Sequence, residues 1–177
     1  MNAEFVQSEA NRVAAALRAE LGDSAASLSC FLDNARLITT PANLIAVLTS
    51  LKDRHGYKLL AELGGADYLK YPGQSSTGAR FEVHYVVRNL QTNHTLIVKV
   101  GADDPNPTIP SATSLWLGAD WMEREVYDMY GVVFEGHPDL RRILMPDEFT
   151  AYPLRKDYPL RGRGERHNFP RITRAQS

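Results

Sequence analysis

The sequence predicts an α+β fold, with a small mixed or antiparallel sheet packed with two or three helices and followed by an extended C-terminal arm. Short apolar and β-branched runs form two hairpin patterns, and three other segments carry apolar residues at helical spacing. From Glu135 onward the pattern changes, because five of the ten prolines fall in the last forty-three residues. We therefore expect a globular body at residues 1–134 and a proline-rich basic arm at residues 135–177.

Each of the three helical segments is bounded by residues that start or stop helices. They are residues 2–21, which end at Gly22; the stretch that Pro41 opens and Gly56 closes; and the stretch from a capping Ser111 to Gly131, in which we expect a bend at Gly118. The helices should pack their apolar stripes on the sheet.

The strand patterns predict one short and one long hairpin. Residues 27–39 contain two apolar runs around an Asp-Asn pair, which tolerates turn geometry. Residues 58–69 predict a third strand, and residues 81–102 predict the longer hairpin around a Gln-Thr-Asn turn. Three prolines within residues 103–110 are expected to end the sheet.

Composition excludes several classes of protein. No stretch approaches the ~18 consecutive apolar residues of a membrane span, and the N-terminus has neither a basic leader nor an apolar signal core, so we expect a cytoplasmic protein. Cys30 is the only cysteine, which excludes an intramolecular disulfide. An iron-sulfur cluster needs about four thiolates, so any redox centre is expected in a partner.

Short catalytic motifs are absent or incomplete. Gly73 and Gly78 have the spacing of a phosphate loop, but Ala79 and Arg80 follow where Lys and Ser or Thr are required, so we interpret this segment as a plain loop. There is no Rossmann fingerprint or nucleophile elbow. The five histidines, at positions 55, 84, 94, 137 and 167, have no paired-ligand spacing. We therefore predict no catalytic, cofactor-binding or metal site in this chain.

The charge is unevenly distributed. Residues 150–177 carry seven Lys/Arg against two Asp/Glu, a net charge of +5, whereas residues 1–149 carry thirteen against nineteen, a net charge of −6. The Arg161-Gly-Arg-Gly segment leaves open a remote alternative, a stand-alone nucleic-acid-binding protein. The acidic body opposes this alternative, and salt-dependent filter binding would test it.

The most informative segment is residues 121–149. On a helix, Met122, Val126 and Met129 share one face, while charged and aromatic residues occupy the others. A solvated charged face is the simplest interpretation, but so many interleaved aromatic residues are more typical of an interface. We expect the carboxylates of Glu123 and Glu125 to pair with arginines.

The nearest candidate partners are Arg141 and Arg142, which the turns at Gly131 and Gly136 can bring back to the helix. Breaking a buried pair costs ~3 to 5 kcal/mol, against less than ~1 kcal/mol for an exposed one. If these pairs are buried, Glu123→Gln or Glu125→Gln should lower stability.

This segment resembles the signature of the complex I 30 kDa subunit family, the C subunits of NADH-quinone oxidoreductase. The strong part of the resemblance covers residues 110–160 and includes the arm as far as Pro159. The matching residues are Glu123, Arg124, Glu125, Asp128, Met129, Tyr130, His137, Arg141, Ile143 and Leu144.

The resemblance implies a non-catalytic scaffold in the peripheral arm of the proton-translocating NADH:quinone oxidoreductase. It implies a neighbouring 49-kDa-type subunit, expected as a separate polypeptide because the chain stops at Ser177, and a peripheral location on the cytoplasmic side of the inner membrane. FMN and iron-sulfur clusters would lie in partner subunits. Related photosynthetic quinone oxidoreductases and membrane-bound hydrogenases use similar subunits and remain alternatives.

The arm contains an internal repeat, since Tyr152-Pro-Leu-Arg155 recurs as Tyr158-Pro-Leu-Arg161. In polyproline II geometry a period of six returns both tyrosines to the same face. Tyr and Arg are frequent interface anchors, so we expect the arm to dock on partner subunits. Deletion of residues 150–177 should then leave a body with unchanged melting that no longer binds its partner.

Overall fold

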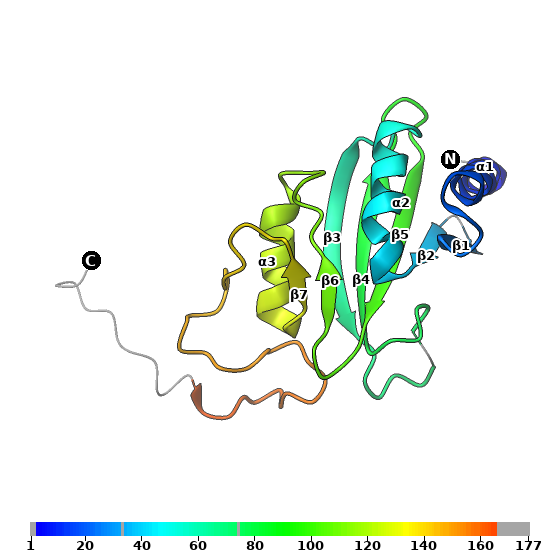
Figure 1. Cartoon of the computed structure of the whole chain (residues 1–177). Helices are drawn as coiled ribbons and strands as arrows, with labels where there is room; N and C mark the ends of the chain where they lie inside the picture. The colour runs from blue at the N-terminus through cyan, green and yellow to red at the C-terminus, as the bar shows by residue number, and fades with distance from the viewer. Residues whose placement is uncertain (1–2, 33, 74, 166–177) are drawn as a thin grey trace.

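The computed structural model describes residues 3–32, 34–73 and 75–165 (Figure 1). Its elements are α1 (Ala3–Leu21), β1 (Ala26–Phe31), β2 (Asn34–Thr39), α2 (Pro41–Asp53), β3 (Leu59–Asp67), β4 (Phe81–Arg88), β5 (Thr95–Ala102), β6 (Thr108–Pro110), α3 (Ala119–Tyr130) and β7 (Val133–Glu135). The predicted α+β class is confirmed, with a mixed sheet and three helices.

The main sheet has five strands in the order β1-β2-β5-β4-β3. Both predicted hairpins are present: β1 pairs antiparallel with β2, and β4 pairs antiparallel with β5. The parallel pairing of β2 with β5 joins the hairpins, with α2 in the connection between β2 and the rest of the sheet. Strand β3 adds antiparallel to β4 and forms one edge.

One face of the sheet supplies most of the core. In β4 the buried residues Phe81, Val83, Tyr85 and Val87 alternate with less buried ones from His84 onward, as expected for a strand with one buried face. Helix α1 packs against β1, β2 and α2; helix α2 contacts β2, β5 and β6; helix α3 lies against β3 and β7. All three helices contribute to one apolar cluster.

The predicted third helix begins later than expected. Residues 113–115 and 117–118 form turns, and α3 starts at Ala119 with Gly118 as its N-cap residue, so the expected bend is a helix start. Ser111 does not cap a helix, because α3 begins only at Ala119; its oxygen accepts from the Thr113 N–H at 3.2 Å, and its hydroxyl donates to the Glu123 carboxylate. The end of α3 at Gly131, with a left-handed φ of 74°, agrees with the sequence.

A second, two-stranded sheet was not predicted. Strands β6 and β7 pair in parallel, with Ile109 opposite Phe134, and both of these side chains are buried. Two three-residue strands, one ending in proline, leave no alternation to recognise in the sequence. The boundary expected between residues 134 and 135 thus falls inside β7.

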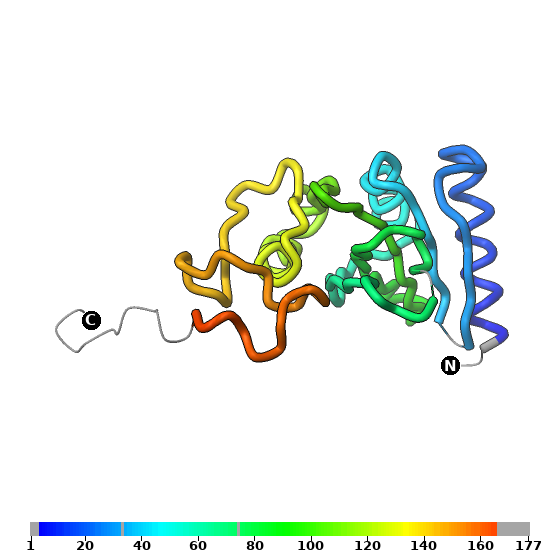
Figure 2. Tube along the Cα trace, turned by 90° about the horizontal axis from the view of Figure 1, so that it is seen from below, coloured from blue at the N-terminus to red at the C-terminus, as the bar shows by residue number. Residues whose placement is uncertain are grey.

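No helix among residues 3–32, 34–73 and 75–165 has the length and apolarity required to cross a bilayer. From residue 136 to residue 164 the chain forms turns and bends without further strands, and it runs beneath α3 and the end of β3 (Figures 1 and 2). Phe149 in this segment is buried. The first half of the expected arm therefore packs on the body of its own chain.

Candidate functional site

The buried carboxylate of Glu123 lies near the start of α3 and has no exposed surface. One of its oxygens accepts a hydrogen bond from the Ser111 hydroxyl at 2.7 Å, and the other accepts from the Ala112 backbone N–H at 2.7 Å. Burial raises the pKa of Glu123, although these two bonds oppose the shift. The expected pairing of Glu123 with an arginine is wrong, because backbone and hydroxyl donors from the segment before α3 occupy both oxygens.

The second buried carboxylate of α3, Asp128, organises the chain after β7. One oxygen accepts N–H bonds from Ile143, Leu144 and Met145 at 3.1, 2.8 and 2.8 Å, and the other accepts from the Arg142 guanidinium at 2.6 Å. Burial alone would raise the pKa of Asp128, but these donors outweigh it and hold the pKa below its usual value. The carboxylate thus fixes the turn at residues 142–145 on the helix.

Of the two arginines expected to pair with α3, Arg142 approaches the helix, and it pairs with Asp128 instead of a glutamate. Its guanidinium also donates to the Ala151 carbonyl at 3.1 Å and lies over the rings of Phe149 and Tyr152, at 5.9 and 5.3 Å from their centroids. A planar guanidinium can serve several acceptors and rings at once. Arg142 therefore joins the helix to residues 149–152.

Arg124, a residue of α3, also binds the segment after β7. Its guanidinium donates to the carbonyls of Arg141 and Arg142, at 3.1 and 3.2 Å, and lies 5.1 Å from the ring centroid of Trp121. The side chain of Arg141 itself points to solvent and pairs with the exposed Asp139. Among the described residues, no arginine forms an ion pair with Glu125, so its expected pairing is also wrong.

Arg80 forms a second junction between the segment and the sheet. Its guanidinium contacts the carboxylates of Asp67, Asp104 and Asp157, with 3.0 Å to Asp67 and 2.9 Å to Asp157. The backbone N–H of Lys156 donates to Asp67 at 2.8 Å. Burial alone would raise the pKa of Asp67, but Arg80 and the N–H donors lower it. Residues 156 and 157 are thereby bound to the end of β3.

The tyrosine repeat does not adopt the expected polyproline II geometry. Backbone bonds from Arg155 to Tyr152, from Tyr158 to Arg155 and from Gly162 to the carbonyl of residue 159 make this segment a series of turns. The Tyr152 ring meets Tyr127 edge-on at 6.3 Å, whereas Tyr158 packs on Phe149. The two tyrosines therefore contact different parts of the molecule.

Close packing at the end of α3 explains why Gly131 is required. A Cβ atom at Gly131 would lie 2.5 Å from the Tyr152 ring, in addition to the strain of its positive φ. Arg155 lies over the Tyr152 ring at 4.6 Å and donates from its Nε to the Tyr130 carbonyl. The helix end and the repeat segment thus form one packed unit.

The site residues expected from the sequence fall into two groups. Those that are buried or half-buried are Glu123, Arg124, Asp128, His137, Arg142, Tyr152, Arg155 and Tyr158; His137 lies within 3.2 Å of the Asp120 carbonyl. Those that are exposed are Glu125, Arg141 and Arg161. No sequence motif indicates the bonding roles of Arg80, Asp67 and Ser111, although Ser111 is a predicted helix cap.

Within the described ranges, no group of three or more His, Cys, Asp or Glu residues could hold a metal ion. The residues of the rejected phosphate loop are used internally, since Ser75 donates to the Ala79 carbonyl and Ser76 to Glu82. The hydrogen bonds around α3 therefore fix the surface that this helix and the segment after β7 present together.

Comparison with known proteins gives the family. The family model described as respiratory-chain NADH dehydrogenase, 30 Kd subunit, matches residues 37–164. The C subunit of NADH-quinone oxidoreductase from Erythrobacter litoralis is 47% identical over 116 residues, which are 66% of this chain and 44% of the relative. The C subunit from Roseiflexus castenholzii is 41% identical over 150 residues, which are 84% of this chain and 83% of the relative.

A solved structure supports the same assignment. The trypsin-resistant fragment (1-134) of Nqo5 is 32% identical, with a TM-score of 0.64, and the match covers 75% of this chain and 99% of the fragment. The relatives are named as C subunits of NADH-quinone oxidoreductase, which does not favour the photosynthetic or hydrogenase alternatives. The chain therefore belongs to the 30 kDa subunit family of respiratory-chain NADH dehydrogenase.

Proposed function

We propose that this chain is a non-catalytic scaffold in the peripheral arm of proton-translocating NADH:quinone oxidoreductase, complex I. Its relatives are subunits of that enzyme, so the oxidation of NADH and reduction of quinone belong to the assembled complex. The observation that carries the proposal is the use of the signature side chains: Asp128 and Arg124 on α3 bind the segment after β7, and Arg142 of that segment binds Asp128.

The neighbour that we propose is the 49-kDa-type subunit, in contact with α3 and the segment packed on it. Large apolar side chains are exposed on these elements, although burial of such groups is favourable by roughly 25 cal/mol per Å². Trp121 is 63% exposed, Leu144 is 62% exposed and Leu117, just before the helix, is 90% exposed. Aromatic anchors of this kind are frequent in the centres of interfaces.

The exposed Leu144 allows a direct test of this contact. We expect Leu144→Glu to prevent co-purification with the 49-kDa-type subunit and to abolish NADH:quinone activity, while the melting of the isolated chain stays unchanged. The matched control is Leu90→Glu, because Leu90 is 65% exposed in the turn between β4 and β5. The control variant should retain both co-purification and NADH:quinone activity. Normal association and activity of the Leu144 variant would contradict the proposed contact.

We propose that partner subunits bind the cofactors and also hold this chain at the membrane. FMN and the iron-sulfur clusters would be bound by partner subunits, and the chain would be held on the cytoplasmic side of the inner membrane only through them. Deletion of the 49-kDa-type subunit should then release this chain from washed membranes. Retention on membranes that lack the partner would contradict this location.

A further inference from the structure

The free edge of β3 carries backbone groups that no strand among the described residues uses. The Tyr68 N–H donates to the Arg80 carbonyl, so Tyr68 faces β4. Because antiparallel pairing alternates along a strand, Gly64 and Ala66 also face β4, whereas the N–H and C=O groups of Leu63 and Gly65 point away from it. Among the described residues, no hydrogen bond outside the sheet ladder uses the backbone groups of Leu63 and Gly65.

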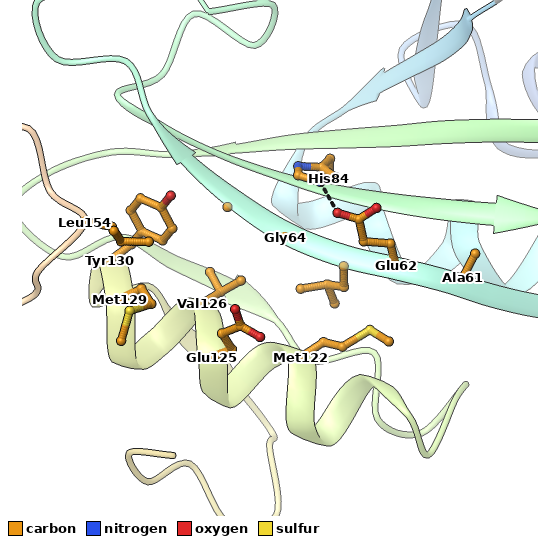
Figure 3. Close-up of a pocket in the computed structure, with 12 residues that line it drawn as sticks. Ala61, Glu62, Gly64, His84, Met122, Glu125, Val126, Met129, Tyr130 and Leu154 are labelled. Carbon is orange, nitrogen blue, oxygen red and sulfur yellow. Dashed lines mark ion pairs between the residues drawn. The ribbon is translucent and has the colours of Figure 1, made fainter. Parts of the chain in front are cut away.

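A groove of about 370 Å³ follows this edge (Figure 3). Helix α3 forms one wall, with the apolar side chains of Met122, Val126 and Met129. His84 lies on the other side of the β3 ribbon. Leu154, whose N–H donates to the Met129 carbonyl at 3.2 Å, lies at one end, beside Tyr130.

Gly64 and Gly65 of β3 have no side chains, which lets neighbouring side chains approach both faces of this strand closely. A Cβ at Gly65 would lie 3.0 Å from the side chains of Val126 and Tyr130, and a Cβ at Gly64 would lie 2.8 Å from the His84 ring. Exposed edge strands are usually protected by lysine, proline or a covering element. Residues 61–66 contain neither lysine nor proline, and the only irregularity is the register shift between Leu60 and Glu62.

The rim of the groove is acidic. The Glu62 side chain is 67% exposed and lies 3.6 Å from His84, and Glu125 on α3 is also exposed. In the described parts of the chain, neither carboxylate forms an ion pair with a lysine or arginine. An occupant with positive charge would therefore match the rim, and apolar side chains would match the methionine wall.

We infer that an extended segment of a partner subunit, carrying Lys or Arg together with long apolar side chains, adds as a strand to the free edge of β3. Main-chain bonds to Leu63 and Gly65 would supply affinity, and the groove would select the side chains that alternate toward α3. The inference rests on the proposed function, because it takes the occupant from another subunit of the complex.

Hydrogen exchange with residue resolution tests the main-chain bonds. The amide hydrogens of Leu63 and Gly65 should exchange quickly in the isolated chain and at least about tenfold more slowly in the purified complex. Those of Gly64 and Ala66, which face β4, are the internal control and should be slow in both states. Equal exchange of Leu63 and Gly65 in the two states would overturn the inference, and so would their protection in the isolated chain.

Charge reversal at the rim tests the chemistry of the occupant. The double variant Glu62→Lys and Glu125→Lys should bind a complex lacking this subunit at least about tenfold more weakly than the wild type. The control, Asp23→Lys, lies in the exposed turn between α1 and β1 and should bind normally. Unchanged binding of the double variant would contradict a basic occupant.

Failure of the proposed function and failure of the strand addition would give different results. If the unmodified chain does not associate with the complex at all, the proposed function is wrong. If it associates normally while Leu63 and Gly65 remain unprotected, only the strand addition is wrong. A homodimer of the isolated chain that protects these two amides would assign the groove to a second copy and would also overturn the inference.

Discussion

The two buried carboxylates of α3 have opposite pKa shifts, although both are fully buried. Glu123 has two neutral donors, the Ser111 hydroxyl and the Ala112 N–H, and these do not offset the loss of hydration. Asp128 has three N–H donors and the Arg142 cation, which together stabilise the charged form. The number and charge of the donors therefore decide which carboxylate stays ionised.

Asp128→Asn should destabilise the fold strongly. The side-chain oxygen of the asparagine can still accept from the backbone N–H groups, but Arg142 loses its buried ionic partner. Removal of one member of a buried ion pair costs about 3 to 5 kcal/mol. Urea unfolding measures the loss. Asp139→Asn, which removes the exposed partner of Arg141, should cost less than about 1 kcal/mol. Similar losses in both variants would contradict the role of Asp128.

Glu123→Gln tests the raised pKa. The folded pKa lies above the unfolded value of about 4.3, so the stability that the protonated carboxyl contributes is present below pH ~4 and is lost as the pH rises through the folded pKa. The glutamine Oε1 can accept from the Ala112 N–H, and its Nε2 can donate to the Ser111 Oγ, so both contacts can persist without charge, the second with its direction reversed. The stability of the Glu123→Gln variant relative to the wild type should therefore increase with pH above about 4. A difference that does not vary with pH would show that Glu123 titrates normally.

At the scale of elements, α3 binds the segments on both sides of it. Glu123 holds the turns before the helix, Asp128 and Arg124 hold the chain after β7, and Gly131 allows Tyr152 to approach. The family signature at these positions thus has a structural cause within the chain. These contacts hold the proline-rich segment after β7 in one conformation against α3, so that the two present one surface.

Ending the chain at Phe149 should lower stability, contrary to the unchanged melting that the sequence predicts. The truncation removes the bonds of Ala151 to Arg142, of Arg155 to the Tyr130 carbonyl, and of residues 156 and 157 to Asp67 and Arg80. We expect a folded body that melts about 5 to 10 °C lower by calorimetry. A chain ending at Tyr158 keeps these bonds and should melt close to the full-length temperature. Loss of partner binding in the shorter chain stays a prediction.

At the scale of the whole molecule, the chain is a mixed sheet whose free edge, beside α3, lies next to the surface that we propose for partners. Strand β3 supplies this edge, and the end of the same strand binds the C-terminal segment through Asp67. The exposed leucines and the acidic groove therefore lie on neighbouring elements.

The purified chain alone should be colourless. Its single cysteine, Cys30, is exposed, and the residues described in the structure contain no metal-binding group. An absorption spectrum should end with the aromatic band in the near ultraviolet, and iron analysis should show no stoichiometric iron. A stoichiometric visible chromophore would contradict the proposed scaffold function.

The sequence by itself determined the elements whose signals are local. Alternation predicted the hairpins of β1 with β2 and β4 with β5, proline and glycine marked α2, and the fixed spacing from Glu123 to Leu144 indicated the family. Only the tertiary structure decided the long-range contacts: the parallel pairing of β2 with β5, the β6–β7 sheet and the partners of the charged residues. Glu123 bonds to Ser111 and Arg80 to Asp157 because packing brings distant segments together, and local periodicity carries no information about such contacts.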